Sequence, residues 1–169
     1  MGAGKTSVGK ALSTMLKHPF IDLDKEIEKQ CLSSIQEIFN DKGEVFFRQK
    51  EMEALSYIVE NYENGIIALG GGTLIKKENR SAIRSNGTLI YLEASPESIL
   101  KRIMNDSTHR PLLEMYRTDK ELLHFIQSHI NERLPDYQKA DSKINTENKS
   151  IDEIVSELVS TIKIKSSPS

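Results

Sequence analysis

The first nine residues constrain the fold of this chain more than any other stretch, because they combine glycines, a lysine and a threonine. Gly4-Lys5-Thr6 match the end of the phosphate-binding pattern G-x-x-x-x-G-K-[ST], whose opening glycine would lie before Met1. Glycines let successive backbone N–H groups point at phosphate oxygens, and the N-terminus of a following helix adds partial positive charge. These residues predict a nucleotide phosphate-binding loop. The alternative is an ordinary glycine-rich turn.

The residues that follow favour the phosphate-binding loop over the turn. Val8, Leu12, Met15 and Leu16 recur at helical spacing, so a helix begins at the lysine, as the motif requires. In this motif the lysine contacts the β- and γ-phosphates, and the threonine hydroxyl binds Mg²⁺. The strand that feeds such a loop would precede Met1, and we expect the sheet of this chain to lack it.

The composition indicates one soluble globular domain. The chain has 169 residues, of which 37% are hydrophobic and 28% charged. A net charge of −2 gives no electrostatic case for a nucleic-acid or anionic-membrane partner, and no apolar run approaches membrane-spanning length. The single cysteine, Cys31, excludes an internal disulfide and suits a reducing cytosol, so we expect a cytoplasmic protein. No unpaired apolar stripe is evident, and we expect a monomer.

Strand and helix patterns alternate along the chain, which predicts an α/β domain with a parallel sheet. We expect the domain to span residues 1–163, with a mobile lid at about 105–118 and a disordered tail at 164–169. Apolar runs predict strands at residues 19–24, 66–69, 88–92 and near 143–145, the second and third of them buried. Periodicity and caps predict helices that begin at residues 5 and 96 and others at 25–31, 33–41, 44–62, 77–85, 119–137 and 151–162.

Three chemically distinctive stretches lie where predicted strands end. They are the phosphate-binding loop, the pair Asp22 and Asp24, and the three glycines at 70–72. In a parallel sheet, ligands bind outside the carboxyl ends of the strands. The sequence therefore predicts one active site at one edge of the sheet.

The two aspartates indicate how such a site would work. Alternation along a strand would place Asp22 and Asp24 on the same side, near the phosphate-binding loop. One carboxylate could bind metal-linked water while the other accepts a proton from a substrate hydroxyl, as phosphoryl transfer to an alcohol requires. The alternative for Asp24 is the N-cap of the following helix.

Other candidate residues are ambiguous when each is considered alone. Arg48 lies three residues before Glu51 on one predicted helical face, and the simplest interpretation is an exposed ion pair. The glycines at 70–72 would let the backbone approach a ligand closely, which a simple turn rarely needs. The four histidines lack metal-ligand spacing with the cysteine, so we assign no zinc site.

Three arginines could contact anionic substrates. Arg110 lies in the predicted mobile loop and could swing onto phosphates, as a lid should. Arg102 and Arg133 lie on predicted helices, where a single arginine is more often part of a solvated face.

Taken together, the motifs resemble those of the shikimate kinases, the small P-loop kinases of the aromatic amino-acid pathway. The likeness runs from Met1 to about residue 162. Each motif alone is weak, but their order and spacing are highly specific. The motifs are Gly2-Ala3-Gly4-Lys5-Thr6-Ser7-Val8-Gly9, Phe20-Ile21-Asp22-Leu23-Asp24, Gly43-Glu44-Val45-Phe46-Phe47-Arg48 with Glu51, Leu69-Gly70-Gly71-Gly72, Arg110-Pro111-Leu112-Leu113 and Glu132-Arg133-Leu134-Pro135-Asp136-Tyr137.

The resemblance implies a three-layer P-loop kinase fold, in which helices flank a parallel sheet. It implies ATP-dependent phosphorylation of the 3-hydroxyl of shikimate to shikimate 3-phosphate, a step toward chorismate. In the family the strand before the loop is central, so its two neighbours here would lose a shared partner, at ~1–3 kcal/mol for each buried group left unpaired. That loss is large against a typical stability of ~5–15 kcal/mol. Relatives often carry proline at the position of Ile151, which affects only the adenine packing.

The resemblance also implies a role for each motif residue. ATP would contact Gly2, Ala3, Gly4, Lys5, Thr6, Ser7, Arg102 and Arg110, with Arg102 stacking on adenine. The Mg²⁺ cofactor would be held by Thr6 and, through water, by Asp22. Shikimate would be held by Asp24, Arg48, Gly70, Gly71, Gly72 and Arg133, with Phe47 and Glu51 lining or bracing the pocket. In catalysis Asp24 would be the base or orienting group, with Lys5 and Arg110 on the transferred phosphoryl group.

Two other interpretations stay open. A related small-molecule kinase, such as a gluconate kinase, would share the phosphate-binding loop. Asp24, Arg48 and Arg133 argue against it, because a different acceptor should change this carboxylate-binding set. An inactive nucleotide-binding remnant would account for a missing first strand, although intact Lys5 and Asp22 argue against such decay.

Overall fold

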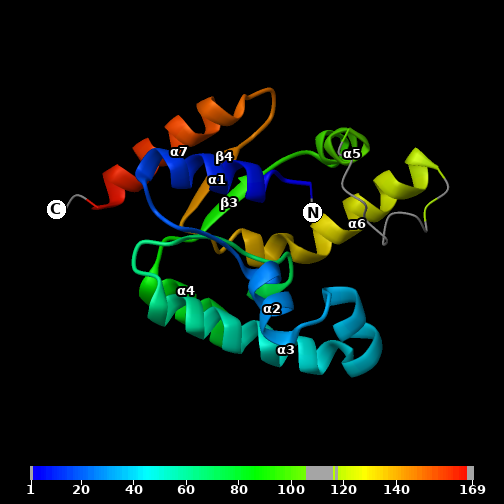
Figure 1. Cartoon of the computed structure of the whole chain (residues 1–169). Coiled ribbons are helices and arrows are strands. Elements are labelled where there is room, and N and C mark those ends of the chain that lie inside the picture. Colours follow the sequence, from blue (N-terminus) through cyan, green and yellow to red (C-terminus); the bar gives the residue numbers. More distant parts are fainter. Residues whose placement is uncertain (1, 106–115, 117, 167–169) are drawn as a thin grey trace.

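The computed structural model describes residues 2–105, 116 and 118–166, and it has helices on both sides of its strands (Figure 1). Helices α1 and α7 lie side by side in one layer, α3 and α4 lie together in the other, and α5 packs on α6. The predicted α/β architecture is confirmed. In chain order the elements are α1 (Lys5–Leu16), β1 (Phe20–Asp22), α2 (Leu23–Cys31), α3 (Ile35–Asn61), β2 (Ile66–Ala68), the 3₁₀-helix η1 (Thr73–Ile75), α4 (Lys77–Asn86), β3 (Ile90–Glu93), α5 (Pro96–Met104), α6 (Asp119–Tyr137), β4 (Ser142–Asn145) and α7 (Ile151–Ser166).

The four strands of the described residues form two parallel pairs instead of one continuous sheet. In the first pair, Ile21 of β1 lies opposite Ile67 of β2; in the second, Leu92 of β3 lies opposite Ile144 of β4. Within the described part of the chain, no strand pairing joins β2 to β3. Each of these two strands therefore has one edge without a strand partner, as expected for neighbours of a strand that would precede the phosphate-binding loop.

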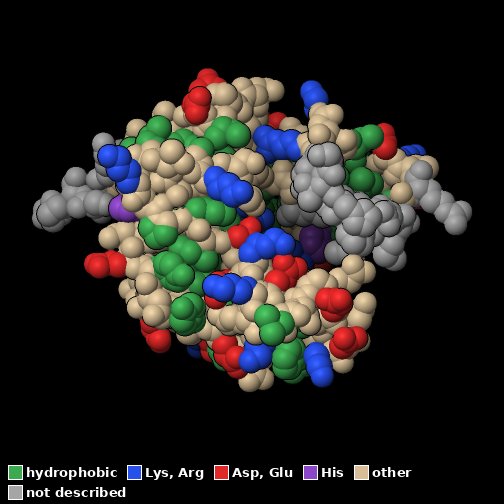
Figure 2. Space-filling view, viewed as in Figure 1, with side chains coloured by type: hydrophobic (Ala, Val, Ile, Leu, Met, Phe, Trp, Pro, Cys, Tyr) green, Lys and Arg blue, Asp and Glu red, His purple; other side chains and the backbone are tan. Residues whose placement is uncertain are grey.

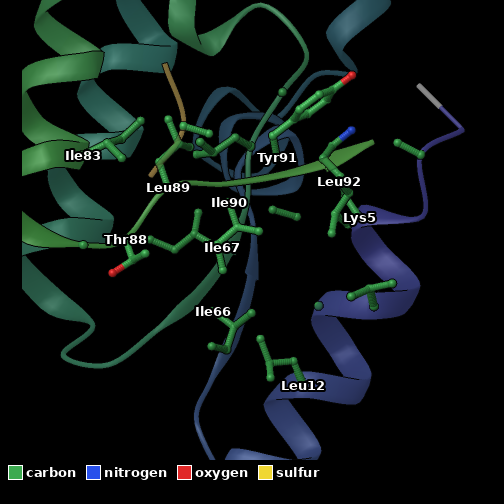
Figure 3. Close-up of a pocket in the computed structure, with 18 of the residues that line it drawn as sticks. Lys5, Leu12, Ile66, Ile67, Ile83, Thr88, Leu89, Ile90, Tyr91 and Leu92 are labelled. Carbon is green, nitrogen blue, oxygen red and sulfur yellow. The ribbon is translucent and has the colours of Figure 1, made fainter. Parts of the chain in front are cut away.

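An apolar cavity of about 510 Å³ lies between the two strand pairs. Side chains of β2 and β3, among them Ile67 and Ile90, face this space (Figure 3). Both strands were expected to be buried, and this prediction is wrong for most of their length: only Ala68 is buried, and the other residues are half-buried. The reason is that their open edges face the cavity and not a neighbouring strand.

The hydrophobic core consists of three clusters that follow the layers. The first joins β1, α2 and α3 and includes Leu55, and the second joins α1, β4 and α7 and includes Leu12. The third joins α5 and α6 and includes Ile126. These three residues, one from each cluster, line the cavity, which therefore lies where the clusters meet.

Local signals in the sequence set several helix ends. Ser34 begins α3 through a capping box with Glu37, and Ser95 caps α5 ahead of Pro96. Gly43 adopts a φ of 77° and interrupts α3 where the sequence predicts a helix end. At the other end of the chain, α7 continues to Ser166, into the predicted tail.

We expect an extended apolar segment of about five residues, joined ahead of Met1, to raise the melting temperature by about 5–10 °C. Such a segment could fill the cavity and pair with the open edges of β2 and β3. Thermal unfolding followed by circular dichroism measures the effect. The matched control carries proline at two positions of the segment, because proline removes a ladder donor. An equal melting temperature with and without the apolar segment would contradict this view of the cavity.

Candidate active site

The phosphate-binding loop leads directly into a helix, as its sequence predicts. Gly4 takes a left-handed conformation, with φ 85°, and is the N-cap of α1, which begins at Lys5. No side chain caps this helix, so the N–H groups of its first turn are available to a ligand. A Cβ on Gly2 would lie 2.8 Å from Ile99 Cγ2, which shows how closely the loop packs on α5.

Asp22 and Asp24 lie on different elements, contrary to the prediction of two alternating strand positions. Strand β1 ends at Asp22, whose side chain is the N-cap of α2 and accepts from Lys25 N at 3.4 Å. Asp24 therefore lies in the first turn of α2, and Asp22 has the capping role that was the alternative for Asp24. The residue between them, Leu23, is fully buried and is the first residue of α2.

The two candidate metal ligands lie together at the N-terminus of α1. Thr6 Oγ1 donates to Asp22 Oδ2 at 3.4 Å. A hydroxyl and one carboxylate suit Mg²⁺, which keeps several of its waters in protein sites. Groups of three or more His, Cys, Asp or Glu that could form a complete protein cage are absent from the described residues. The pair therefore fits a Mg²⁺ ion that arrives with nucleotide phosphates.

Lys5 and Asp24 are close enough to influence each other's ionisation. Burial lowers the pKa of the Lys5 ammonium, whereas the carboxylates of Asp24 and Asp22 act to raise it. Burial raises the pKa of the Asp24 carboxyl, and the charge of Asp22 raises it further, against the effect of Lys5. Each group is thus less easily charged here than in water. A phosphate next to the ammonium would favour its charged form.

The 70–72 glycine turn has a charged side chain against each of its residues. These side chains come from three helices: α2, α6 and α3. Any residue with a Cβ would displace them, which explains why three consecutive glycines stand here. A Cβ on Gly70 would lie 2.9 Å from Asp24 Oδ1, and a Cβ on Gly72 would lie 2.6 Å from Arg48 Nη2. A Cβ on Gly71 would overlap Arg133 Nη1.

The interpretation of Arg48 and Glu51 as an exposed ion pair is wrong. Glu51 is fully buried, and its Oε2 accepts from Arg48 Nη1 at 3.0 Å. The Arg48 side chain is itself only 12% exposed and lies over the buried ring of Phe47, 5.1 Å from its centroid. Glu44, which is exposed, accepts from the Nε and Nη2 atoms of the same arginine at 3.2 Å. The pair is thus part of the wall of the site.

Tyr137 contacts the glycine turn next to Arg133. Its hydroxyl donates to the carbonyl of Gly71 at 3.0 Å, and its ring stacks on Tyr91 of β3 at 5.1 Å. Arg133 lies one helical turn earlier on α6, so the same helix supplies both the cation and the support for the turn it faces.

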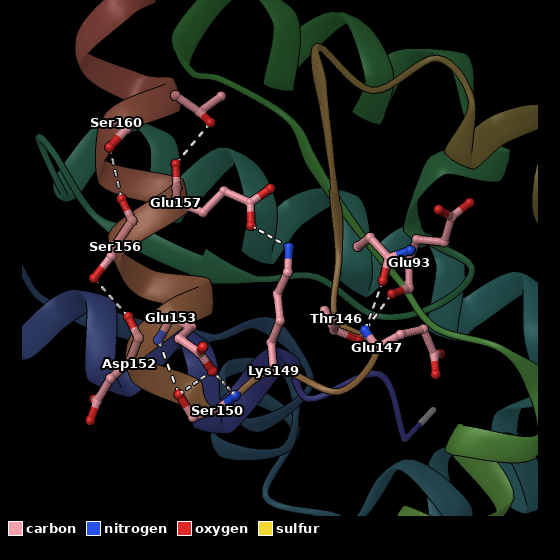
Figure 4. Close-up of polar contacts among 12 residues, drawn as sticks. Glu93, Thr146, Glu147, Lys149, Ser150, Asp152, Glu153, Ser156, Glu157 and Ser160 are labelled. Atoms are coloured by element: carbon pink, nitrogen blue, oxygen red, sulfur yellow. Dashed lines mark hydrogen bonds and ion pairs between the residues drawn. The ribbon is translucent and has the colours of Figure 1, made fainter.

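Arg102 lies apart from this cluster. Its Nη1 donates to Thr146 Oγ1 at 3.0 Å, and its Nη2 donates to Thr146 O at 2.9 Å. It therefore connects α5 to the segment between β4 and α7, where Thr146 Oγ1 donates to Glu93 O at 2.9 Å. Further along this segment, Lys149 forms an ion pair with Glu157 of α7 (Figure 4). The adenine contact proposed for Arg102 stays a prediction.

Arg110 lies outside the described residues, as does most of the predicted lid. In the space-filling view, basic and acidic side chains lie side by side near the centre of the face shown (Figure 2). Within the described ranges, no helix has the length and apolar character needed to cross a bilayer.

Comparison with known proteins identifies the family. A sequence model of shikimate kinases matches residues 1–163. The chain belongs to the shikimate kinase family. A shikimate kinase of Alkaliphilus oremlandii is 43% identical over 162 residues, which cover 96% of this chain and 94% of that protein.

Solved structures of family members share the fold. The structure of a shikimate kinase from Bacteroides thetaiotaomicron matches with a TM-score of 0.90 and 33% identity, covering 96% of this chain and 94% of that one. The shikimate kinase of Acinetobacter baumannii, solved in complex with shikimate, matches with a TM-score of 0.85 and 30% identity, covering 99% of this chain and 91% of that one. A gluconokinase from Sinorhizobium meliloti is 15% identical with a TM-score of 0.57, which is a likeness of fold alone.

Two residues at the site were missed by the sequence interpretation. Thr73 is fully buried and its hydroxyl donates to Glu51 Oε1 at 2.8 Å, and Tyr137 supports the glycine turn. Thr73 directly follows the glycine triplet, and Tyr137 ends the motif that contains Arg133. Both residues adjoin or belong to motifs noted in the sequence, but their hydrogen-bond partners, Glu51 and Gly71, are distant along the chain.

We expect Asp24→Asn to raise the free energy of unfolding at pH 7. Because the folded-state pKa of Asp24 is raised, the fold favours the neutral carboxyl, and ionisation destabilises the folded state above that pKa. This disadvantage of the wild type disappears as the pH falls below the unfolded-state pKa of about 3.9. Urea unfolding at pH 7 and near pH 4 should show the two proteins converging in acid.

The matched control for this measurement is Asp41→Asn, which changes an exposed aspartate of α3. We expect it to alter stability by at most about 0.5 kcal/mol at either pH. A difference between wild type and Asp24→Asn that grows toward acid would contradict the direction of the pKa shift.

Proposed function

We propose that this chain transfers the γ-phosphoryl group of ATP to the 3-hydroxyl of shikimate, giving shikimate 3-phosphate on the route to chorismate and the aromatic amino acids. One observation carries the proposal. Asp24, Arg48 and Arg133, from three helices, converge on the 70–72 glycine turn beside Lys5 of the phosphate-binding loop. This arrangement offers a carboxylate for a hydroxyl and two guanidinium groups for a carboxylate, next to a site for phosphates.

The phosphate side of the reaction belongs to the N-terminus of α1. Backbone N–H groups of Gly2, Ala3, Gly4, Lys5, Thr6 and Ser7 would surround the ATP phosphates. Thr6 and, through water, Asp22 would hold Mg²⁺, which neutralises charge on the phosphate oxygens when it is bound. The Lys5 ammonium would contact the transferred group. Arg110 would neutralise further charge in the transition state, and Arg102 would stack on adenine.

The acceptor side combines binding with proton transfer. Arg48 and Arg133 would bind the shikimate carboxylate, since guanidinium groups form strong, directional bonds to carboxylates. Asp24, beside Gly70, would orient the 3-hydroxyl and accept its proton as the new bond to phosphorus forms. Its raised pKa makes it a better proton acceptor than an ordinary carboxylate. Phe47 and Glu51 would support Arg48 from behind.

The decisive experiment is a coupled assay with ATP and shikimate, with gluconate as the alternative acceptor. Turnover of shikimate supports the proposal. Turnover of gluconate alone would replace it with the related kinase. If neither acceptor is phosphorylated while ATP still binds, the inactive nucleotide-binding remnant would be the better description. Cytoplasmic location and a monomeric state belong to the same proposal.

We expect Arg48→Ala to raise the KM for shikimate by about 10- to 100-fold, because it removes a charge-assisted interaction worth about 1.5–3 kcal/mol. The KM for ATP should change by less than about twofold, since Arg48 lies on the acceptor side of the site. Steady-state kinetics with each substrate varied in turn give both constants. The matched control is Arg84→Ala, an exposed arginine of α4, which should leave both constants unchanged. An unchanged KM for shikimate in Arg48→Ala would remove Arg48 from the acceptor site.

A further inference from the structure

A buried carboxylate stands behind the arginine that faces the glycine turn. Glu51 on α3 is fully buried, and each of its carboxylate oxygens accepts one hydrogen bond. Arg48 Nη1 donates to Oε2 at 3.0 Å, and the Thr73 hydroxyl donates to Oε1 at 2.8 Å. Thr73 is also fully buried. These two hydrogen bonds, one to each oxygen, limit the rotation of the carboxylate.

The orientation of the Arg48 guanidinium depends on the orientation of the Glu51 carboxylate to which it donates. The arginine has a second acceptor, Glu44, whose side chain is 63% exposed and binds the Nε and Nη2 atoms. An exposed partner is screened by water and holds a guanidinium weakly, whereas a buried carboxylate holds it firmly. The guanidinium lies against Gly72, so a small rotation would move it off the turn or into the backbone.

Thr73 presents its hydroxyl from a rigid support. Its carbonyl accepts from Asn79 Nδ2 at 3.0 Å, and Asn79 is buried in α4. The backbone N–H of Thr73 donates to the carbonyl of Gly70 at 3.2 Å. On the following residues of η1, Arg80 Nη1 donates to the carbonyls of Leu74 and Ile75. Helix α4 thus fixes the backbone on which the hydroxyl is mounted.

We propose that Thr73 is a positioning residue for the acceptor: its hydroxyl orients Glu51, and Glu51 orients Arg48 toward the anionic group of the acceptor. The inference rests on the proposed function in one respect, that Arg48 binds an anionic acceptor. It adds a determinant of acceptor affinity that touches neither substrate. The hydroxyl of Thr73 is the group that orients Glu51, and a side chain of the same β-branched shape without a hydroxyl would not orient it.

The test compares Thr73→Val, which keeps the branched shape and removes the hydroxyl, with Thr73→Ser, which keeps the hydroxyl. We expect Thr73→Val to raise the KM for shikimate by about fivefold to tenfold, the loss expected for one hydrogen bond. The kcat and the KM for ATP should stay within about twofold, and Thr73→Ser should restore the KM for shikimate. A purely structural role would instead lower the melting temperature with no selective change in this KM, and that result would overturn the proposal.

The route through Glu51 is tested by a double-mutant cycle. If Thr73 acts through Glu51, then Thr73→Val combined with Glu51→Gln should raise the KM for shikimate no more than Glu51→Gln alone. Independent, multiplying effects would overturn the proposal. Thr14→Val, an exposed threonine of α1, is the matched control and should leave the kinetics unchanged. Thr73→Ala, which also lacks the hydroxyl, replaces the valine variant in every comparison if that variant does not fold.

A measurement without substrate separates this inference from the proposed function. The ¹⁵N resonance of the Arg48 side chain, assigned by its loss in Arg48→Lys, reports the orientation of the guanidinium in the ligand-free protein. We expect it to shift in Thr73→Val and to return in Thr73→Ser. An unshifted resonance would overturn the positioning role even if the wild type phosphorylates shikimate. A shifted resonance in a protein that does not phosphorylate shikimate would support the positioning role and reject the proposed function.

Discussion

The rest of this structure depends on one constraint: charged side chains closely approach the backbone of a turn made of glycines. Asp24, Arg48 and Arg133 each have an atom too close to the turn for a Cβ to be added at Gly70, Gly72 and Gly71 respectively. Only glycine permits that approach, and only helices fixed in place can bring three such side chains to one turn. The layered packing, the caps and the core clusters all serve to hold α2, α3 and α6 in these positions.

The site also concentrates charge in a partly buried space. Lys5 and Asp24 are each harder to ionise than in water, because burial removes solvent from both. Glu51 is buried with two donors, which matches the rule that a buried charge needs partners for its lone pairs. An anionic ligand next to Lys5 would favour the charged form of its ammonium group. Burial of ionisable groups is the usual way in which an active site lowers stability in exchange for function.

Much of the architecture could be predicted because its signals are local. The helix after Lys5, the caps at Ser34 and Ser95 and the interruption at Gly43 each depend on neighbouring residues, and each is found in the structure. The interpretation was wrong where the outcome depended on distant partners. Glu51 is buried and accepts a hydrogen bond from Thr73, which is distant along the chain. Strands β2 and β3 are half-buried because each has a strand partner on one edge alone among the described residues.

The sequence by itself determined the order of helices and strands, the phosphate-binding loop and the residues that resemble a shikimate kinase, because motifs and periodicity are carried by neighbouring residues. Only the tertiary structure decided how those residues meet. It placed Asp24 on a helix and not on a strand, made Glu51 a buried support for Arg48, and brought Arg133 to the same turn from α6. These outcomes depend on the packing of segments that are far apart along the chain, and no local pattern encodes that packing.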